Sequence, residues 1–316
     1  MREYIIKRII SVIPILVIVA LIVFFLVHLT PGDPAAVILG PAATITELER
    51  LRGEMGLDQP LLKQLLVWLS DILRGDLGRS LFMRKTVIEA FLEHLWPTLS
   101  LALGGQIIAI IIAIPLGIVA ANRRGSHIDR SVSVFSTLGV SIPNFLLALL
   151  MVLVFSVGLP LLPVAGFRPL RMGLWTHIRY LILPTLTLGI IQAALLTRVT
   201  RSSMLEVLNS NYVKTAYAKG LSERAVIVRH AFRNAFIPIL TVIGQSFTQL
   251  IVGAIVVEVV FNIPGIGQLL INAISRRDFQ VIQGSILLIA LTFILINLVI
   301  DLLYGLLDPR IRLNRK

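Results

Sequence analysis

The chain has 316 residues, of which 56% are hydrophobic and only 15% are charged, and its mean hydropathy is +0.90. A soluble domain is about 45–50% apolar and about 25% charged, so the composition indicates an integral membrane protein. Cysteine is absent, which excludes disulfides, thiolate metal sites and a cysteine nucleophile. In a hydrophobic chain, the net charge of +12 indicates basic cytoplasmic loops rather than a nucleic-acid partner.

Long apolar stretches are the main feature of the sequence. Because a membrane helix needs about 20 apolar residues, they predict spans near residues 9–29, 99–121, 134–158, 180–198, 238–260 and 283–306. The first stretch is expected to be a retained helix, since its apolar part exceeds the roughly 7–15 residues of a signal core. The fold class predicted is therefore all-α, a polytopic membrane protein with six transmembrane helices in the lipid bilayer.

Basic residues predict the orientation of these spans. If both termini are cytoplasmic, the short inner connections carry 17 Lys and Arg, and the short outer connections carry 5. Because cytoplasmic loops have an excess of Lys and Arg, we expect both termini inside and residues 31–98 outside.

The segment 31–98 has the pattern of a small helical extracytoplasmic region. Thr44-x-x-Glu47 and Thr46-x-x-Glu49 form overlapping capping boxes. Asp58 and then Pro60, at an early helical position, begin an amphipathic helix that runs to Leu73, and Thr86 is a candidate cap for a further helix through about His94. Two interpretations remain open, a helical cap on the membrane region and a platform or lid for a partner.

Small and polar residues recur at intervals of four, which places them on one face of a helix. In two spans these stripes favour close helix packing; they are Ala109, Ala113, Gly117 and Ala121, and Thr185, Gly189, Ala193 and Thr197. The fifth span has Thr241, Gln245, Gln249 and Gly253 on one face. Its amides either bond to neighbouring helices or line a water-filled path, since unpaired amides in hydrocarbon are costly. Gln245, Gln249 and Gly253 are therefore candidate path residues.

Motifs for chemistry are missing from the sequence. It contains no G-x-x-x-x-G-K-[ST] phosphate loop, no H-E-x-x-H and no G-x-S-x-G. The five histidines are scattered without metal-ligand spacing. We therefore expect neither an enzyme nor a metal or cofactor site in this chain.

The connection 198–237 is long, basic and patterned as helices. A helical stretch over 206–219 is followed by Gly220, which suits the left-handed position that ends a helix. Ser222 is a candidate N-cap for a second helix over 223–236. Its apolar and small residues favour a docking surface, and a solvated basic loop is the alternative.

These residues resemble a known family. The loop contains Tyr212-Val-Lys-Thr-Ala-Tyr-Ala-Lys-Gly220-Leu-Ser-Glu223 and Arg229-His-Ala-Phe-Arg-Asn-Ala-Phe-Ile-Pro238. It resembles the coupling loop of type I ABC-importer permeases, in the dipeptide, oligopeptide, glutathione and nickel branch. Three further stretches agree in order along the chain: Leu29-Thr-Pro-Gly-Asp-Pro34, Gly75-Asp-Leu-Gly-Arg-Ser80, and Glu258-Val-Val-Phe-Asn-Ile-Pro-Gly-Ile-Gly267.

The resemblance implies a coupling site and a division of the chain. The implied ATPase-coupling residues are Tyr212, Lys214, Thr215, Ala216, Lys219, Gly220, Leu221, Ser222 and Glu223. Of the general E-A-A-x-x-x-G pattern only Ala216 and Gly220 match, because Lys214 and Thr215 replace the Glu and the first Ala. The implied domains are an N-terminal span (1–30), an extracytoplasmic segment (31–94), a core with five spans and the loop 198–237 (95–307), and a basic cytoplasmic tail (308–316).

The resemblance also implies partners and a location. These are a second homologous permease, two ATP-binding subunits that hold ATP and Mg, and an extracytoplasmic substrate-binding protein, in a bacterial-type inner membrane. We therefore expect a permease subunit of an ATP-driven importer for small peptides or related solutes. The alternative is a secondary transporter or channel subunit that works without ATP, and the helical cytoplasmic loop favours the importer.

Overall fold

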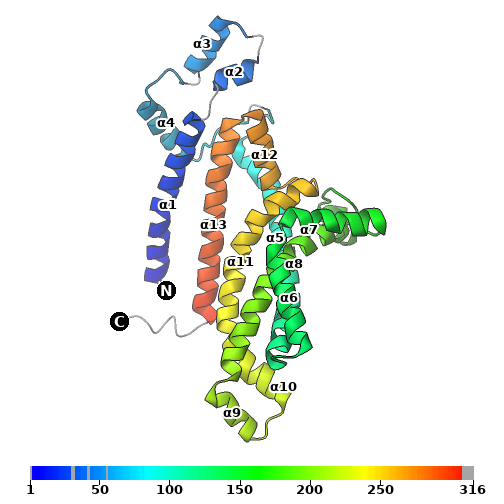
Figure 1. Ribbon diagram of the computed structural model, residues 1–316. Helices are drawn as coiled ribbons and strands as arrows, with labels where there is room; N and C mark the ends of the chain where they lie inside the picture. The colour runs from blue at the N-terminus through cyan, green and yellow to red at the C-terminus, as the bar shows by residue number, and fades with distance from the viewer. Residues whose placement is uncertain (1, 30–32, 41–42, 55, 81, 308–316) are drawn as a thin grey trace. The chain divides into compact units, whose positions relative to one another are not determined.

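The computed structural model describes residues 2–307 except 30–32, 41–42, 55 and 81. The described part of the chain is helical, with one isolated bridge between Arg79 and Thr86. The helices (Figure 1) are α1 (Arg2–Leu29), α2 (Pro34–Leu39), α3 (Ile45–Glu54), α4 (Leu61–Leu73), α5 (Val87–Asn122), α6 (His127–Ser141), α7 (Asn144–Met151), α8 (Leu174–Leu208), α9 (Asn211–Ala218), α10 (Glu223–Ala225), α11 (Phe232–Val260), α12 (Ile266–Arg276) and α13 (Phe279–Leu307). The tail 308–316 lies outside the described residues.

Five helices in the described part are long and apolar enough to cross a membrane, and a sixth span requires a broken helix pair. The prediction of one helix over 134–158 is wrong, because α6 and the segment that starts with α7 meet at 106°. Pro143 lies at this bend with extended backbone, φ −61° and ψ 141°. Proline lacks the N–H that would continue the helix and disfavours helical geometry in the residue before it.

Several predicted spans are parts of longer helices. The predicted cap helix after Thr86 is the start of α5, which continues through Pro97 into the span. Thr86 and Glu89 form the capping box there, with Glu89 N–H donating to the Thr86 hydroxyl (3.2 Å) and Thr86 N–H to the Glu89 carboxylate (3.0 Å). The predicted helix 223–236 likewise continues into the fifth span, and Glu223–Val260 forms one stretch of 38 residues.

The chain divides into two compact units. Unit 1 contains residues 1–95 and 268–298, and unit 2 contains residues 96–267 and 299–316. In unit 1, Val87 and Ala90 of α5 pack against Leu269 and Ala273 of α12 and Val281 of α13. The Ser80 hydroxyl donates to the buried Asp278 carboxylate (2.6 Å), which joins segments almost 200 residues apart.

The N-terminal helices of unit 1 carry the predicted capping chemistry. Thr44 and Glu47 form the first box at the start of α3, with Thr44 N–H donating to Glu47 at 2.9 Å. The hydrogen bonds from the Thr44 side chain and backbone lower the pKa of Glu47. Thr46 lies inside α3, so the second box is not a cap. α4 begins at Leu61, so Pro60 is the residue before the helix and not an early helical residue, and α4 lies at the Leu29 end of α1 (Figure 1).

Helix α8 lies at the centre of unit 2, packed on α6 and α11. Residues of both small-residue stripes lie where α5 and α8 approach each other, which confirms close packing between these helices. A Cβ on Gly117 would lie 2.5 Å from Thr200 Cβ, and one on Gly189 would lie 2.6 Å from Ile108 Cγ2. At Gly104 a Cβ would lie 3.2 Å from Thr185 Cβ. Only small residues allow the two backbones to approach this closely.

A buried carboxylate holds the end of α11 in unit 2. Glu258 is fully buried and accepts hydrogen bonds from the Thr98 hydroxyl (2.5 Å) and from Gly267 N–H (2.8 Å). Thr98 Oγ1 in turn accepts from Ile266 N–H (2.9 Å). Gly265 lies so close to the Glu258 carboxylate that any Cβ there would collide with it. The motif 258–267 is therefore a turn built around one acidic side chain.

Candidate functional site: a helical loop between two spans

The loop between α8 and α11 contains the short helix α9 and a turn. α8 ends at Leu208, and α9 runs over Asn211–Ala218, so the predicted single helix over 206–219 is broken at Asn209 and Ser210. Gly220 has φ +76°, which confirms the left-handed position predicted for the end of this helix. Gly220 N–H donates to Tyr217 C=O (2.9 Å) and completes the turn.

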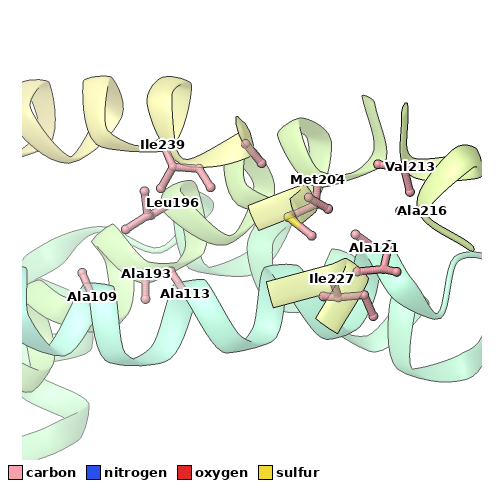
Figure 2. Packing of buried hydrophobic residues seen from close by; sticks show 13 residues of the cluster. Ala109, Ala113, Ala121, Ala193, Leu196, Met204, Val213, Ala216, Ile227 and Ile239 are labelled. Carbon is pink, nitrogen blue, oxygen red and sulfur yellow. The ribbon is translucent and has the colours of Figure 1, made fainter. Parts of the chain in front are cut away.

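The inner face of α9 is part of the hydrophobic core of unit 2. Val213 is fully buried and Ala216 is 7% exposed. Figure 2 shows them grouped with Ala121 of α5, Met204 of α8 and Ile227 at one end of the cluster. The loop is therefore packed onto the ends of the spans, and a freely solvated loop is excluded for these residues.

The outer face of α9 and the turn are exposed. Tyr212, Tyr217 and Leu221 are 43%, 44% and 40% exposed. Tyr212 and Leu221 belong to the predicted coupling site and Tyr217 does not. The further exposed residues of that site are Lys214, Thr215, Lys219, Gly220, Ser222 and Glu223. Ala216 is the exception, because its side chain packs into the chain's own core.

Three polar contacts were missed by the sequence analysis, and two of them attach this loop to the spans. Asn234 Nδ2 donates to Tyr212 Oη (2.7 Å), which joins α11 to α9. Asn122 Nδ2 donates to Glu223 Oε1 (2.8 Å), which joins the end of α5 to the start of α10. Each contact links residues more than 20 positions apart, so no local pattern predicts it.

The third contact is an ion pair between α6 and α8. Arg201 donates twice to the buried Asp129 carboxylate, from Nε (2.5 Å) and Nη2 (2.9 Å), and Gly125 N–H also donates to it (2.9 Å). Bidentate pairs of this kind fix orientation as well as adding energy. The sequence gives one indication of this ion pair, since Asp129 is the single acidic residue in the basic connection 122–132.

The candidate path residues on α11 differ in exposure. Gln245 and Gln249 are exposed on α11, and neither amide is hydrogen-bonded to the part of the chain that the structure describes. Gly253 is half-buried, and a Cβ there would lie 3.0 Å from Asn144 Nδ2. The polar contact between α5 and α11 comes instead from Ser246 and Gln106, which are 3.0 Å apart. Gln245 and Gln249 are thus not hydrogen-bonded within unit 2.

Among the described residues, no group of three or more His, Asp or Glu side chains could hold a metal ion. The described part contains a set of apolar spans and an exposed helical loop that packs on their ends. This geometry is that of a polytopic membrane protein with an exposed helical loop, and the comparisons identify its class.

Residues 113–313 match the family "Binding-protein-dependent transport system inner membrane component", and residues 1–102 match "Binding-prot-dependent transport system membrane comp, N-term". The chain belongs to this family and is a multi-pass inner-membrane permease subunit of an ATP-driven importer. ATP is hydrolysed by separate ATPase subunits, which together with a substrate-binding protein are its partners.

Relatives match the chain over nearly its full length. It is 43% identical over 312 residues to a probable peptide ABC transporter permease of Sinorhizobium fredii, which covers 99% of this chain and 100% of the relative. It is 45% identical to a putative peptide transport system permease of Brucella abortus and 44% identical to the glutathione transport system permease GsiC of Escherichia coli, each covering 99% of both chains.

A solved structure has the same fold. A chain of the MetNI methionine ABC transporter, in inward facing conformations, aligns with a TM-score of 0.56 and 18% identity, covering 70% of this chain and 97% of its own. This likeness confirms the type I importer permease fold predicted from the sequence.

Proposed function

We propose that this permease imports short peptides or closely related solutes and that α9 is the helix through which ATPase subunits drive it. The substrate class is supported by the similarity to relatives named as peptide and glutathione permeases. Glutathione is itself a modified tripeptide, so one path for small, flexible, polar molecules fits both names.

The observation that supports the coupling role is the two-faced packing of α9. Tyr217 and Leu221 present an exposed apolar surface, while Val213 and Ala216 are buried against the ends of α5 and α8. Apolar and aromatic side chains of this kind form the centre of protein interfaces. A subunit bound to the outer face would therefore move the helices packed on the inner face.

We infer that residues 95–307 form the transport core together with a second, homologous permease. On α11, Thr241, Gln245 and Gln249 form an exposed polar strip at intervals of four residues. Unpaired amides are costly in lipid, which favours a wet path or a partner helix over the bilayer as their surroundings. In this proposal both termini are cytoplasmic, and the ATPase subunits bind ATP and Mg.

The coupling role is tested by Tyr217→Glu and Leu221→Glu, each in the complete transporter reconstituted in vesicles. We expect both variants to insert normally but to lose most co-purifying ATPase subunit and the ATP hydrolysis that loaded binding protein stimulates. Ile45→Glu is the matched control, since Ile45 is also exposed and apolar but lies in α3. Normal coupling in both loop variants would refute the assignment.

The substrate class is tested by uptake of labelled dipeptides, tripeptides and glutathione into the same vesicles. We expect ATP-dependent accumulation of at least one of them, and free amino acids should not compete. Accumulation without ATP would instead support a secondary transporter.

A further inference from the structure

Helix α4 of unit 1 is an apolar helix without a buried side chain. Apart from Lys63, Gln64, Ser70 and Asp71, each of its residues is apolar. Leu62, Leu66 and Leu73 are 68%, 60% and 89% exposed. Their spacing of four and seven residues places them on one face of the helix. In water, this face would be an unusually apolar surface for so short a segment.

Contacts with α1 place α4 at a definite depth along the first span. The rings of Trp68 and Phe24 lie 5.6 Å apart, and His28 Nε2 lies 3.0 Å from Gln64 Oε1. The apolar part of α1 is Val12–Leu29. At 1.5 Å per residue, Phe24 lies roughly 7–8 Å inside its Leu29 end. Trp68 is therefore level with the boundary between headgroups and acyl chains, where Trp is enriched in membrane proteins.

Helices α1 and α4 both have exposed apolar side chains. On α1, the side chains of Ile18, Ile22 and Leu29 are exposed, as expected for residues in contact with acyl chains. On α4, the polar Lys63 instead bonds to Gln59 just before the helix (3.0 Å). Gln64 and Trp68 contact α1, and Leu62, Leu66 and Leu73 lie on the opposite side of α4. An exposed apolar face backed by a polar side is a feature of a helix that lies in the membrane interface.

We propose that α4 is an interfacial helix whose Leu62, Leu66 and Leu73 face inserts among phospholipids at the Leu29 end of α1. Lipid contact would hold the segment between α1 and α5 flat against the membrane surface. The inference depends only on α1 spanning the bilayer, so it stands whether or not α9 couples to an ATPase.

Spin-label accessibility tests this proposal directly, because the chain contains no cysteine. Leu62→Cys, Leu66→Cys and Leu73→Cys are labelled in the complete transporter, reconstituted in nanodiscs of phosphatidylethanolamine and phosphatidylglycerol. The cysteine-free permease in the same complex gives the background from partner subunits. Ile22→Cys in α1 is the lipid-facing control, and Lys63→Cys is the matched control on α4.

We expect the three leucine positions to collide with oxygen several-fold more often than with water-soluble nickel–EDDA, as at position 22, and the reverse at position 63. Preference for the nickel reagent at the leucine positions would overturn the proposal, since it means a water-exposed face. Shielding from both reagents would also overturn it, because it means that a protein partner covers the face.

A second measurement avoids changing the apolar face. With Trp96→Phe and Trp175→Phe, Trp68 is the remaining tryptophan. Lipids brominated near the headgroup should quench its fluorescence more strongly than lipids brominated near the chain ends. Equal, negligible quenching by both lipids would contradict an interfacial position.

Discussion

At the scale of single residues, burial decides what each position of the loop can do. In the sequence 212–217, the residues Tyr212, Val213, Ala216 and Tyr217 fall on one broad helical face, so the pattern alone does not tell which of them are buried. The turn at Gly220 could be predicted, since its requirement for positive φ is local. The burial of Ala216 could not, since it depends on α5 and α8, which are distant in sequence.

Ala216→Glu should therefore destabilise the permease itself. A carboxylate placed in the apolar cluster is left without a partner, which costs several kcal/mol. Ala218→Glu is the control, because Ala218 is exposed in the same helix. Thermal unfolding of the purified chain in detergent should show a lower midpoint for the first variant and little change for the second. Equal midpoints would contradict the burial of Ala216.

Glu258 gives a second prediction at this scale. Glu258→Ala leaves the buried Gly267 N–H without its acceptor, and an unpaired buried group costs about 1–3 kcal/mol. Gly265→Ala should have a similar effect, because its methyl group would displace the same carboxylate. Gly53→Ala is the control, since nothing lies within 4 Å of a Cβ there. If the first two variants unfolded at the wild-type temperature, the carboxylate would not stabilise the turn.

At the scale of helices, the sequence predicts where apolar segments lie better than where helices begin and end. The predicted span 99–121 lies within α5, and 180–198 lies within α8. Charged residues mark the edge of the apolar part, whereas the helix continues as long as backbone hydrogen bonds and packing permit. The break after Ser141 shows the opposite case, because a proline ends a helix inside an apolar stretch.

The contact between α5 and α8 predicts a specific cross-link. Cysteines at Gly104 and Thr185 would have Cβ atoms about 3.2 Å apart, slightly closer than the roughly 3.5–4.5 Å of a disulfide. We expect the double variant to form an intramolecular disulfide under mild oxidation, detected by a gel shift that reductant reverses. The pair Gly104→Cys and Thr187→Cys should react poorly, because residues two apart do not share a helix face.

At the scale of the whole molecule, the nonlocal pairing of segments was beyond sequence reasoning. Unit 1 joins residues 1–95 with 268–298 through contacts such as Ser80 with Asp278. The spacing of apolar residues does not predict such a pairing. It shows which face of a helix is buried, but not which other segment covers that face. The family could nevertheless be identified, since several short motifs in order carry more information than the periodicity of any one helix.

The orientation of the chain is a prediction at this scale. Because 17 basic residues lie in one set of short connections and 5 in the other, we expect Thr46→Cys to react with an impermeant thiol reagent added outside intact cells. Ser222→Cys should react only after the membrane is opened. Both residues are exposed in the structure, so a failure to react reflects location. Reversed labelling would place α9 outside and exclude its coupling role.

The central position of α8 also bears on how the chain is made. Among the five long helices it has the lowest mean hydropathy, 1.7 against 3.2 for α1, and 61% of its most apolar window is buried inside the protein. Its buried polar residues include Thr187, Gln192 and Thr200. During synthesis, the transfer of such a helix by itself from the translocon into lipid is only weakly favourable in free energy, since insertion depends on how apolar the segment is. Of α6 and α11, which both pack on it, α6 precedes α8 in the chain and α11 follows it, so α6 is a neighbour already made when α8 emerges.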